Sequence, residues 1–154
     1  MMNLRETWLQ LSSKYSKNLS LQQELLTEIV TAYQESKRFY HNLDHLVYLV
    51  DLANQYQTQI EDFDTLLFSI FYHDIIYQVR QKNNEIESAE LAAKRLSSLN
   101  YPSSKIQKCS RQIRATIDHQ FNQESDTNWL LDFDLAILGE ARSKYVEYTK
   151  NIRK

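Results

Sequence analysis

The 154-residue chain contains one glycine, one proline and one cysteine. Tight β-hairpins usually need glycine or asparagine, so this scarcity argues against a fold built from many hairpins. A single cysteine, Cys109, excludes an internal disulfide, which is typical of proteins in a reducing compartment. Because hydrophobic residues still make up 42% of the chain, it can bury a core. These features predict an all-α fold, a single-domain helical bundle.

Long hydrophobic runs and a strong net charge are lacking too. No segment approaches the roughly 20 apolar residues of a membrane span, and the N-terminus lacks the apolar block of a secretion signal. A formal net charge of -2 does not favour nucleic acid, which usually selects a basic face. We therefore expect a cytoplasmic protein with neither a membrane nor a nucleic acid as its partner.

Apolar residues recur with helical spacing along the chain. Ser20 and Asn84 are predicted N-caps, Glu87 would complete a capping box, and Gly139 would end a short helix. The amphipathic N-terminal helix, with Trp8, could contribute to a homodimer. The expected helices cover about 4–15, 21–36, 42 onward, 64–77, 84–99, Pro102 onward and 129–139, with an amphipathic segment over 140–152.

The most apolar stretch, residues 66–77, reads LLFSIFYHDIIY and holds a histidine and an aspartate side by side. A helix here should be largely buried, and burying an unpaired carboxylate is very costly. The sequence offers few buried cations that could compensate Asp74. A bound metal ion would do so, with His73 and Asp74 as adjacent ligands.

Two further histidines precede an apolar helix in FYHNLDHL. If one helix covers His41 and His45, their Cβ atoms stand about 6 Å apart on one face. His45 is in register with Leu49 and Tyr56, so it should point inward. His41 could reach the same cavity from its rim.

Each candidate also has a structural explanation that the sequence leaves open. A lone inward histidine is more often a hydrogen-bonded core residue than a ligand. Asp132 and Asp134 could cap the short helix, and Asp134 could pair with Arg38 or Arg114. Glu85 could be no more than a favourable charge at a helix N-terminus.

The combination of residues is harder to explain in this way. Together they would form a set of two histidines and two aspartates from separate helices. Nitrogen and oxygen ligands of this kind suit Mn, Fe, Co, Ni or Zn, and carboxylates with water also allow Mg. We therefore predict a centre of one or two divalent metal ions, held by His45, His73, Asp74 and Asp134.

With these residues the chain resembles the HD superfamily of metal-dependent phosphohydrolases, and within it a group of small bacterial proteins described as predicted HD phosphohydrolases. The resemblance covers about residues 38–139 of a predicted single domain, 1–154. Members of that group continue past the position of Lys154, which implies a shortened chain or a missing C-terminal cap. The matching stretches are RFYHNLDHLVYLV, LLFSIFYHDIIYQ, NNEIESAELAA, IRATIDH and LLDFDLAILG.

The resemblance also implies roles for individual residues. His45, the His73–Asp74 pair and Asp134 match the metal ligands, and His41 matches a proton donor to the leaving group. His119 matches a phosphate contact or second-metal ligand, and Glu85 matches a family position to which no definite role is assigned. Apart from the resemblance, Lys37, Arg38 or Arg114 could neutralise the phosphate.

The expected activity is hydrolysis of a phosphomonoester or phosphodiester, such as a nucleotide, by metal-activated water. Two alternatives remain open. The same ligands could serve a nucleotide sensor without turnover, and a metal-free helical interaction domain would need no ligands at all.

Overall fold

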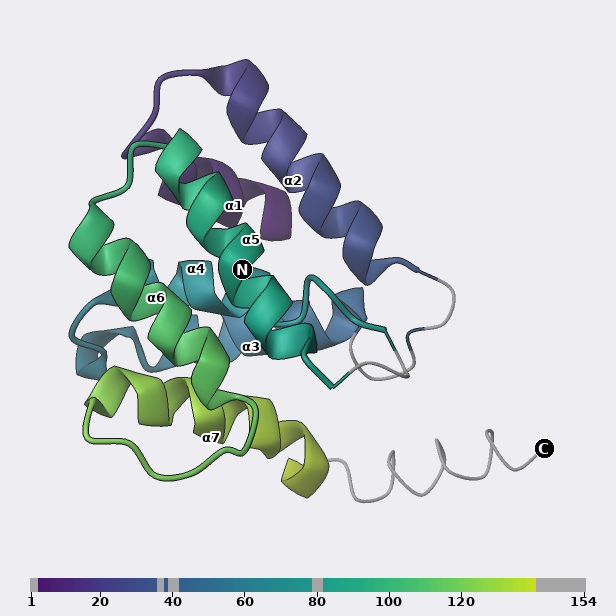
Figure 1. Ribbon diagram of the computed structural model, residues 1–154, viewed down its shortest axis with the longest axis vertical. Coiled ribbons are helices and arrows are strands. Elements are labelled where there is room, and N and C mark those ends of the chain that lie inside the picture. The colour runs from purple at the N-terminus through teal and green to yellow at the C-terminus, as the bar shows by residue number, and fades with distance from the viewer. Residues whose placement is uncertain (1–2, 36–37, 39–41, 79–81, 141–154) are drawn as a thin grey trace.

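The structure is a computed structural model that describes residues 3–35, 38, 42–78 and 82–140. This part of the chain contains α-helices and one short 3₁₀ helix but no strand, which confirms the all-α prediction (Figure 1). In chain order the elements are α1 (Leu4–Ser13), α2 (Leu19–Tyr33), α3 (Leu43–Gln55), η1 (Gln57–Gln59), α4 (Phe63–Tyr72), α5 (Asn84–Ser98), α6 (Ser103–Ala115) and α7 (Ser125–Glu140).

Helix α4 lies at the centre of the bundle. Every residue from Thr65 to Tyr72 is buried, as the absence of a wet face in this stretch predicted. The helix contacts α3, α5, α6 and α7, and Figure 1 shows α5 beside α6 with α7 across one end. One core of buried side chains joins residues from every α-helix in the described part of the chain.

Trp8 is part of this core and is 0% exposed. Its ring packs edge-on against Phe68 and Phe71, and its indole N–H donates to the carbonyl of Gln22 at 2.9 Å. Trp8 itself is therefore not exposed for a contact with a second copy, and the homodimer stays a prediction. The first helix turns its tryptophan inward because the aromatic face of α4 covers it.

Several predicted helix starts need correction. Asn18 rather than Ser20 caps α2, where its side chain accepts from the amide of Leu21. Helix α5 follows Asn83 and has no side-chain cap, so the capping box with Glu87 does not form. Asn84 instead bonds through its side chain to the main chain of Gln78.

The helix ends differ more. Helix α4 stops at Tyr72, five residues before the predicted end at Tyr77, and α6 begins after Pro102 rather than at it. Helix α7 is longer than predicted: it starts at Ser125 and continues through Gly139. The amphipathic segment predicted over 140–152 lies outside the described residues beyond Glu140.

A tertiary contact accounts for the early start of α7. Asp126 is 1% exposed, and its carboxylate accepts from the amides of Glu61 and Asp62 just before α4. Charge-assisted bonds of this kind compensate for the burial of a carboxylate. The polar residues that suggested a loop are thus held in a helical turn.

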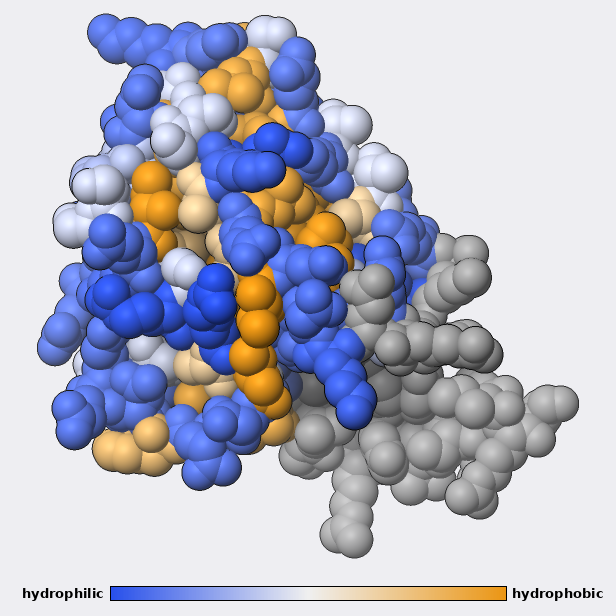
Figure 2. Space-filling view, viewed as in Figure 1, coloured by the Kyte–Doolittle hydropathy of each residue, from blue (hydrophilic) through white to orange (hydrophobic). Residues whose placement is uncertain are grey.

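The outer surface is polar where it can be seen. The face in Figure 2 is covered mainly by hydrophilic side chains, with hydrophobic ones visible in gaps between them. Among the described residues, no helix has both the length and the apolar character needed to cross a bilayer.

Candidate metal centre

His73 and Asp74 lie where α4 has ended. His73 is the C-cap residue, and residues 73–76, here called the 73–76 turn, follow without helical structure. The helix predicted over 64–77 would have included both residues, and that prediction is wrong. Because they sit at a helix end, both side chains face the start of α3 and the middle of α7.

His45 and Asp134 approach this turn from two other helices. His45 is in the first turn of α3, where the side chain of Asn42 caps the helix and accepts from the amide of His45 at 3.0 Å. Asp134 lies on α7. The side chain of His45 is 3% exposed and that of Asp134 is 13% exposed, so the space they share is largely closed to water.

The four predicted ligands converge. His45 Nε2 lies 3.1 Å from Asp134 Oδ1 and 3.9 Å from Asp74 Oδ2. His73 Nε2 lies 3.1 Å from Asp74 Oδ2 and 3.5 Å from Asp134 Oδ1. One ligand atom from each residue lies within 4.8 Å of all the others. We call these four residues the His–Asp cluster, and their arrangement could hold a metal ion.

The hydrogen bonding of His73 favours a cation in the His–Asp cluster. Its Nδ1 lies 2.7 Å from the carbonyl of Ile70, which can only accept, so Nδ1 carries a proton. Its Nε2 is buried and lies 3.1 Å from Asp74 Oδ2 and 3.5 Å from Asp134 Oδ1. A neutral ring would therefore turn its Nε2 lone pair toward two carboxylate oxygens. A metal ion at that point would satisfy all three groups, and a carbonyl on the far nitrogen is the usual support for a histidine ligand.

A proton on Nε2 is the other way to supply positive charge. Burial alone would lower the pKa of His73, but the charge of Asp74 and the bonds to Asp134 and Asp74 raise it well above its ordinary value. Burial would likewise raise the pKa of Asp134, yet hydrogen bonds from His119, His45 and His73 hold it well below. Positive charge in the cluster would therefore be favourable, and either protons or a metal ion could supply it.

His119 supports the cluster from outside. It lies beyond the end of α6 at a positive φ of 55°, and its Nε2 is 2.7 Å from Asp134 Oδ2. This hydrogen bond is the main reason that its pKa is raised. Asp134 therefore joins His45 through one oxygen and His119 through the other. His119 was a predicted contact to phosphate or a second metal, but its bond to Asp134 was not predicted.

Arg38 has a role that the sequence analysis did not predict. Its guanidinium donates to the carbonyl of Asp74 at 2.6 Å and to that of Ile75 at 2.9 Å. It therefore binds the main chain of the 73–76 turn. No sequence pattern links these residues, because the bond connects positions 36 and 37 residues apart.

The other predicted residues do not belong to the cluster, as far as the described residues go. Glu85 is half-buried in the first turn of α5. Arg114 is exposed on α6, where its Nε donates to Ser110 at 3.3 Å. Lys37 and His41 lie outside the described residues.

An open pocket of about 570 Å³ adjoins the residues that support the cluster. Its lining includes Tyr33 and Arg38, whose side chains bond to the main chain of the 73–76 turn. It also includes Asn42, which caps α3. Its lining is mainly polar and also includes Gln34, Glu35, Leu43 and Asp44.

Comparison with known proteins adds no family to this picture. No protein-family model, curated protein or solved structure matches the chain. The functional argument therefore depends on the His–Asp cluster itself.

Proposed function

We propose that the protein is a metal-dependent phosphohydrolase of the HD superfamily type. It would cleave a phosphomonoester or phosphodiester bond, and the expected substrate is a nucleotide. The observation that carries this proposal is the convergence of two imidazoles and two carboxylates from α3, α4 with its following turn, and α7. The resemblance of the sequence motifs to that superfamily supports it.

The donor set suits the chemistry. His45 and His73 would offer nitrogen and Asp74 and Asp134 would offer oxygen, a set that fits divalent Mn, Fe, Co, Ni or Zn and, with water, Mg. Such an ion, when bound, activates water for attack on phosphorus. His73 is oriented for ligation by the carbonyl of Ile70, and Asp134 is oriented by His119.

Two further steps belong to residues of this chain. His41, if protonated near neutral pH, would donate a proton to the leaving oxygen, a role for which histidine is suited. Lys37 and Arg114 remain proposed cations for the phosphate, and His119 and Glu85 remain proposed contacts to phosphate or a second metal. Arg38 is better explained as support for the 73–76 turn, because it already donates to two of its carbonyls.

Metal analysis combined with a substrate screen tests the proposal. Purified protein should contain a divalent metal and should release product from phosphatase or phosphodiesterase substrates with Mn, Co, Ni or Mg. His73→Ala should lose metal and activity together. His41→Ala should keep the metal and lose about 10²- to 10⁴-fold in rate, as expected for a general acid.

The same experiment separates the alternatives. Tight nucleotide binding without product in any metal would favour a sensor. Protein that contains no metal and takes up none would favour a metal-free interaction domain. Loss of metal from His41→Ala would overturn the role of His41 as the acid.

A further inference from the structure

We propose that Tyr33 and Arg38 are positioning residues of the metal centre, because they hold the 73–76 turn in the conformation that presents His73 and Asp74. The inference rests on the proposed function for the metal and goes beyond it by assigning roles to two residues outside the His–Asp cluster. Both residues come from the α2 side of the molecule, far in sequence from the turn.

The hydroxyl of Tyr33 bridges the end of α4 and the turn. It donates to the carbonyl of Phe71 at 3.1 Å and accepts from the amide of Asp74 at 3.1 Å. The last carbonyls of a helix have no partner within it, so Phe71 needs such a donor. Tyr33 is 0% exposed, so both bonds lie away from water.

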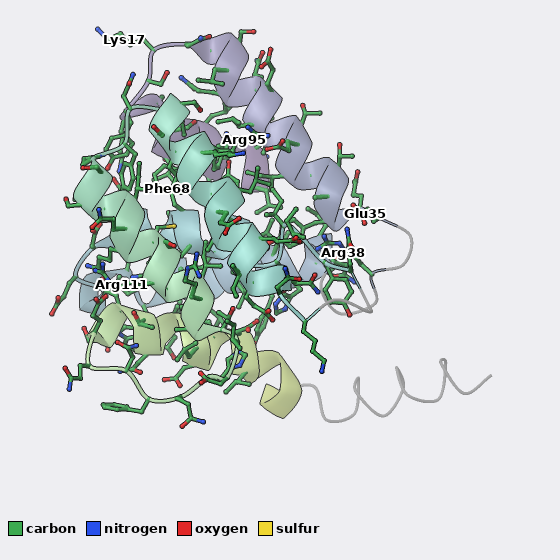
Figure 3. The ribbon with its side chains drawn as sticks, in the orientation of Figure 1. Lys17, Glu35, Arg38, Phe68, Arg95 and Arg111 are labelled. Carbon is green, nitrogen blue, oxygen red and sulfur yellow. The ribbon has the colours of Figure 1, made fainter. Side chains whose placement is uncertain are left out.

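Arg38 holds the next part of the turn. Its two terminal nitrogens reach the successive carbonyls of Asp74 and Ile75, and its side chain is buried, with the residue 6% exposed. The guanidinium also lies over the rings of Tyr33 and Tyr77, at 5.1 and 5.4 Å from their centroids. Figure 3 places Arg38 just beyond the C-terminal end of α2.

These bonds matter because a turn lacks the repeating hydrogen bonds that fix a helix. The amide and the carbonyl of Asp74 are each held by a different side chain, Tyr33 and Arg38. The direction in which the Asp74 carboxylate leaves the main chain therefore depends on both. A ligand must be held within about 0.5 Å of its productive position, and support outside the ligand shell typically changes metal affinity about 10- to 100-fold.

Cobalt binding to Tyr33→Phe tests the proposal, since Co²⁺ reports ligand geometry through its visible spectrum. The matched control is Tyr101→Phe, which removes another buried hydroxyl, one that bonds to Thr65 at the opposite end of α4. Thr65 is about 12 Å from His73 along the helix axis. A second variant, Arg38→Lys, keeps the charge but loses the fork that reaches two carbonyls.

We expect Tyr33→Phe and Arg38→Lys to weaken Co²⁺ binding about 10- to 100-fold and to change the spectrum of the bound ion. Tyr101→Phe should lower the melting temperature but keep the wild-type Kd and spectrum. If folded Tyr33→Phe binds Co²⁺ with the Kd and spectrum of the wild-type protein, the positioning role alone is overturned. If Tyr33→Phe does not fold, the same result for Arg38→Lys overturns it. Wild-type protein that binds no divalent metal would overturn this inference together with the proposed function.

Discussion

Replacing Asp74 by asparagine distinguishes two explanations of the His–Asp cluster: a metal site and a buried network of ion pairs. The substitution keeps the size of the side chain and removes its charge. In wild-type protein, ligand oxygens of Asp74 and Asp134 lie within 4.8 Å of each other. At an effective dielectric constant of about 20, two carboxylates this close repel each other by at least about 3 kcal/mol. A divalent cation between them removes this repulsion and should stabilise the fold strongly.

The expected size of the effect follows from linkage. Metal at about 100 times its Kd stabilises the folded state by about 2.7 kcal/mol. For a chain of this length, 1 kcal/mol corresponds to about 2–4 °C, so wild-type melting should rise by about 5–11 °C. Loss of a direct ligand should cost at least the roughly 100-fold seen for supporting residues. Asp74→Asn would then gain at most about 0.4 kcal/mol, or 1–2 °C, at the same metal concentration.

Thermal unfolding with and without Mn, Co, Ni, Zn or Mg at one pH measures this difference. Asp126→Asn is the matched control, because it makes the same chemical change at a buried carboxylate outside the His–Asp cluster. The control should start from a lower melting temperature and still show the full metal-induced rise. The reasoning is refuted if no metal raises the melting temperature of wild-type protein, or if both variants respond to metal equally.

Three further predictions concern single side chains. His119→Ala removes the 2.7 Å partner of Asp134 and should weaken metal binding about 10- to 100-fold by calorimetry; unchanged affinity would contradict its supporting role. Burial raises the pKa of the Cys109 thiol to about 12, so at pH 8 the thiol stays protonated and iodoacetamide should modify it only in denaturant. Rapid labelling of native protein would show that Cys109 is not buried. Trp8→Ala should lower the free energy of unfolding by about 3–5 kcal/mol in urea titrations, whereas a loss below about 1 kcal/mol would place Trp8 at the surface.

Local features of the sequence were sufficient for the all-α class and for the need of a cation beside Asp74. A chain with one glycine and helical spacing of its apolar residues has few alternatives to a helical bundle. An aspartate next to a histidine in the most apolar stretch needs a compensating cation, and that need follows from the residue types alone. His45, His73 and Asp74 were predictable from such features, whereas the choice of Asp134 over Asp132 came from the resemblance to the HD motifs. The structure brings all four together.

Other features depend on contacts that no local pattern encodes. The residues around Ile75 and Ile76 look helical because they are apolar, yet α4 ends before them. Remote side chains, Tyr33 and Arg38, bind the main-chain groups of that region. In the same way, the amphipathic spacing of the first helix did not reveal that the aromatic face of α4 covers Trp8.

The sequence by itself thus determined which side chains this protein has available for a cation, because charge and burial follow from composition and spacing. Only the tertiary structure decided how they are presented. Side chains remote in sequence bind the turn that follows α4, and His119 binds Asp134. Each of these hydrogen bonds joins residues at least 15 positions apart. Hydrogen bonds across such separations depend on how the helices pack, and packing is a property of the whole fold.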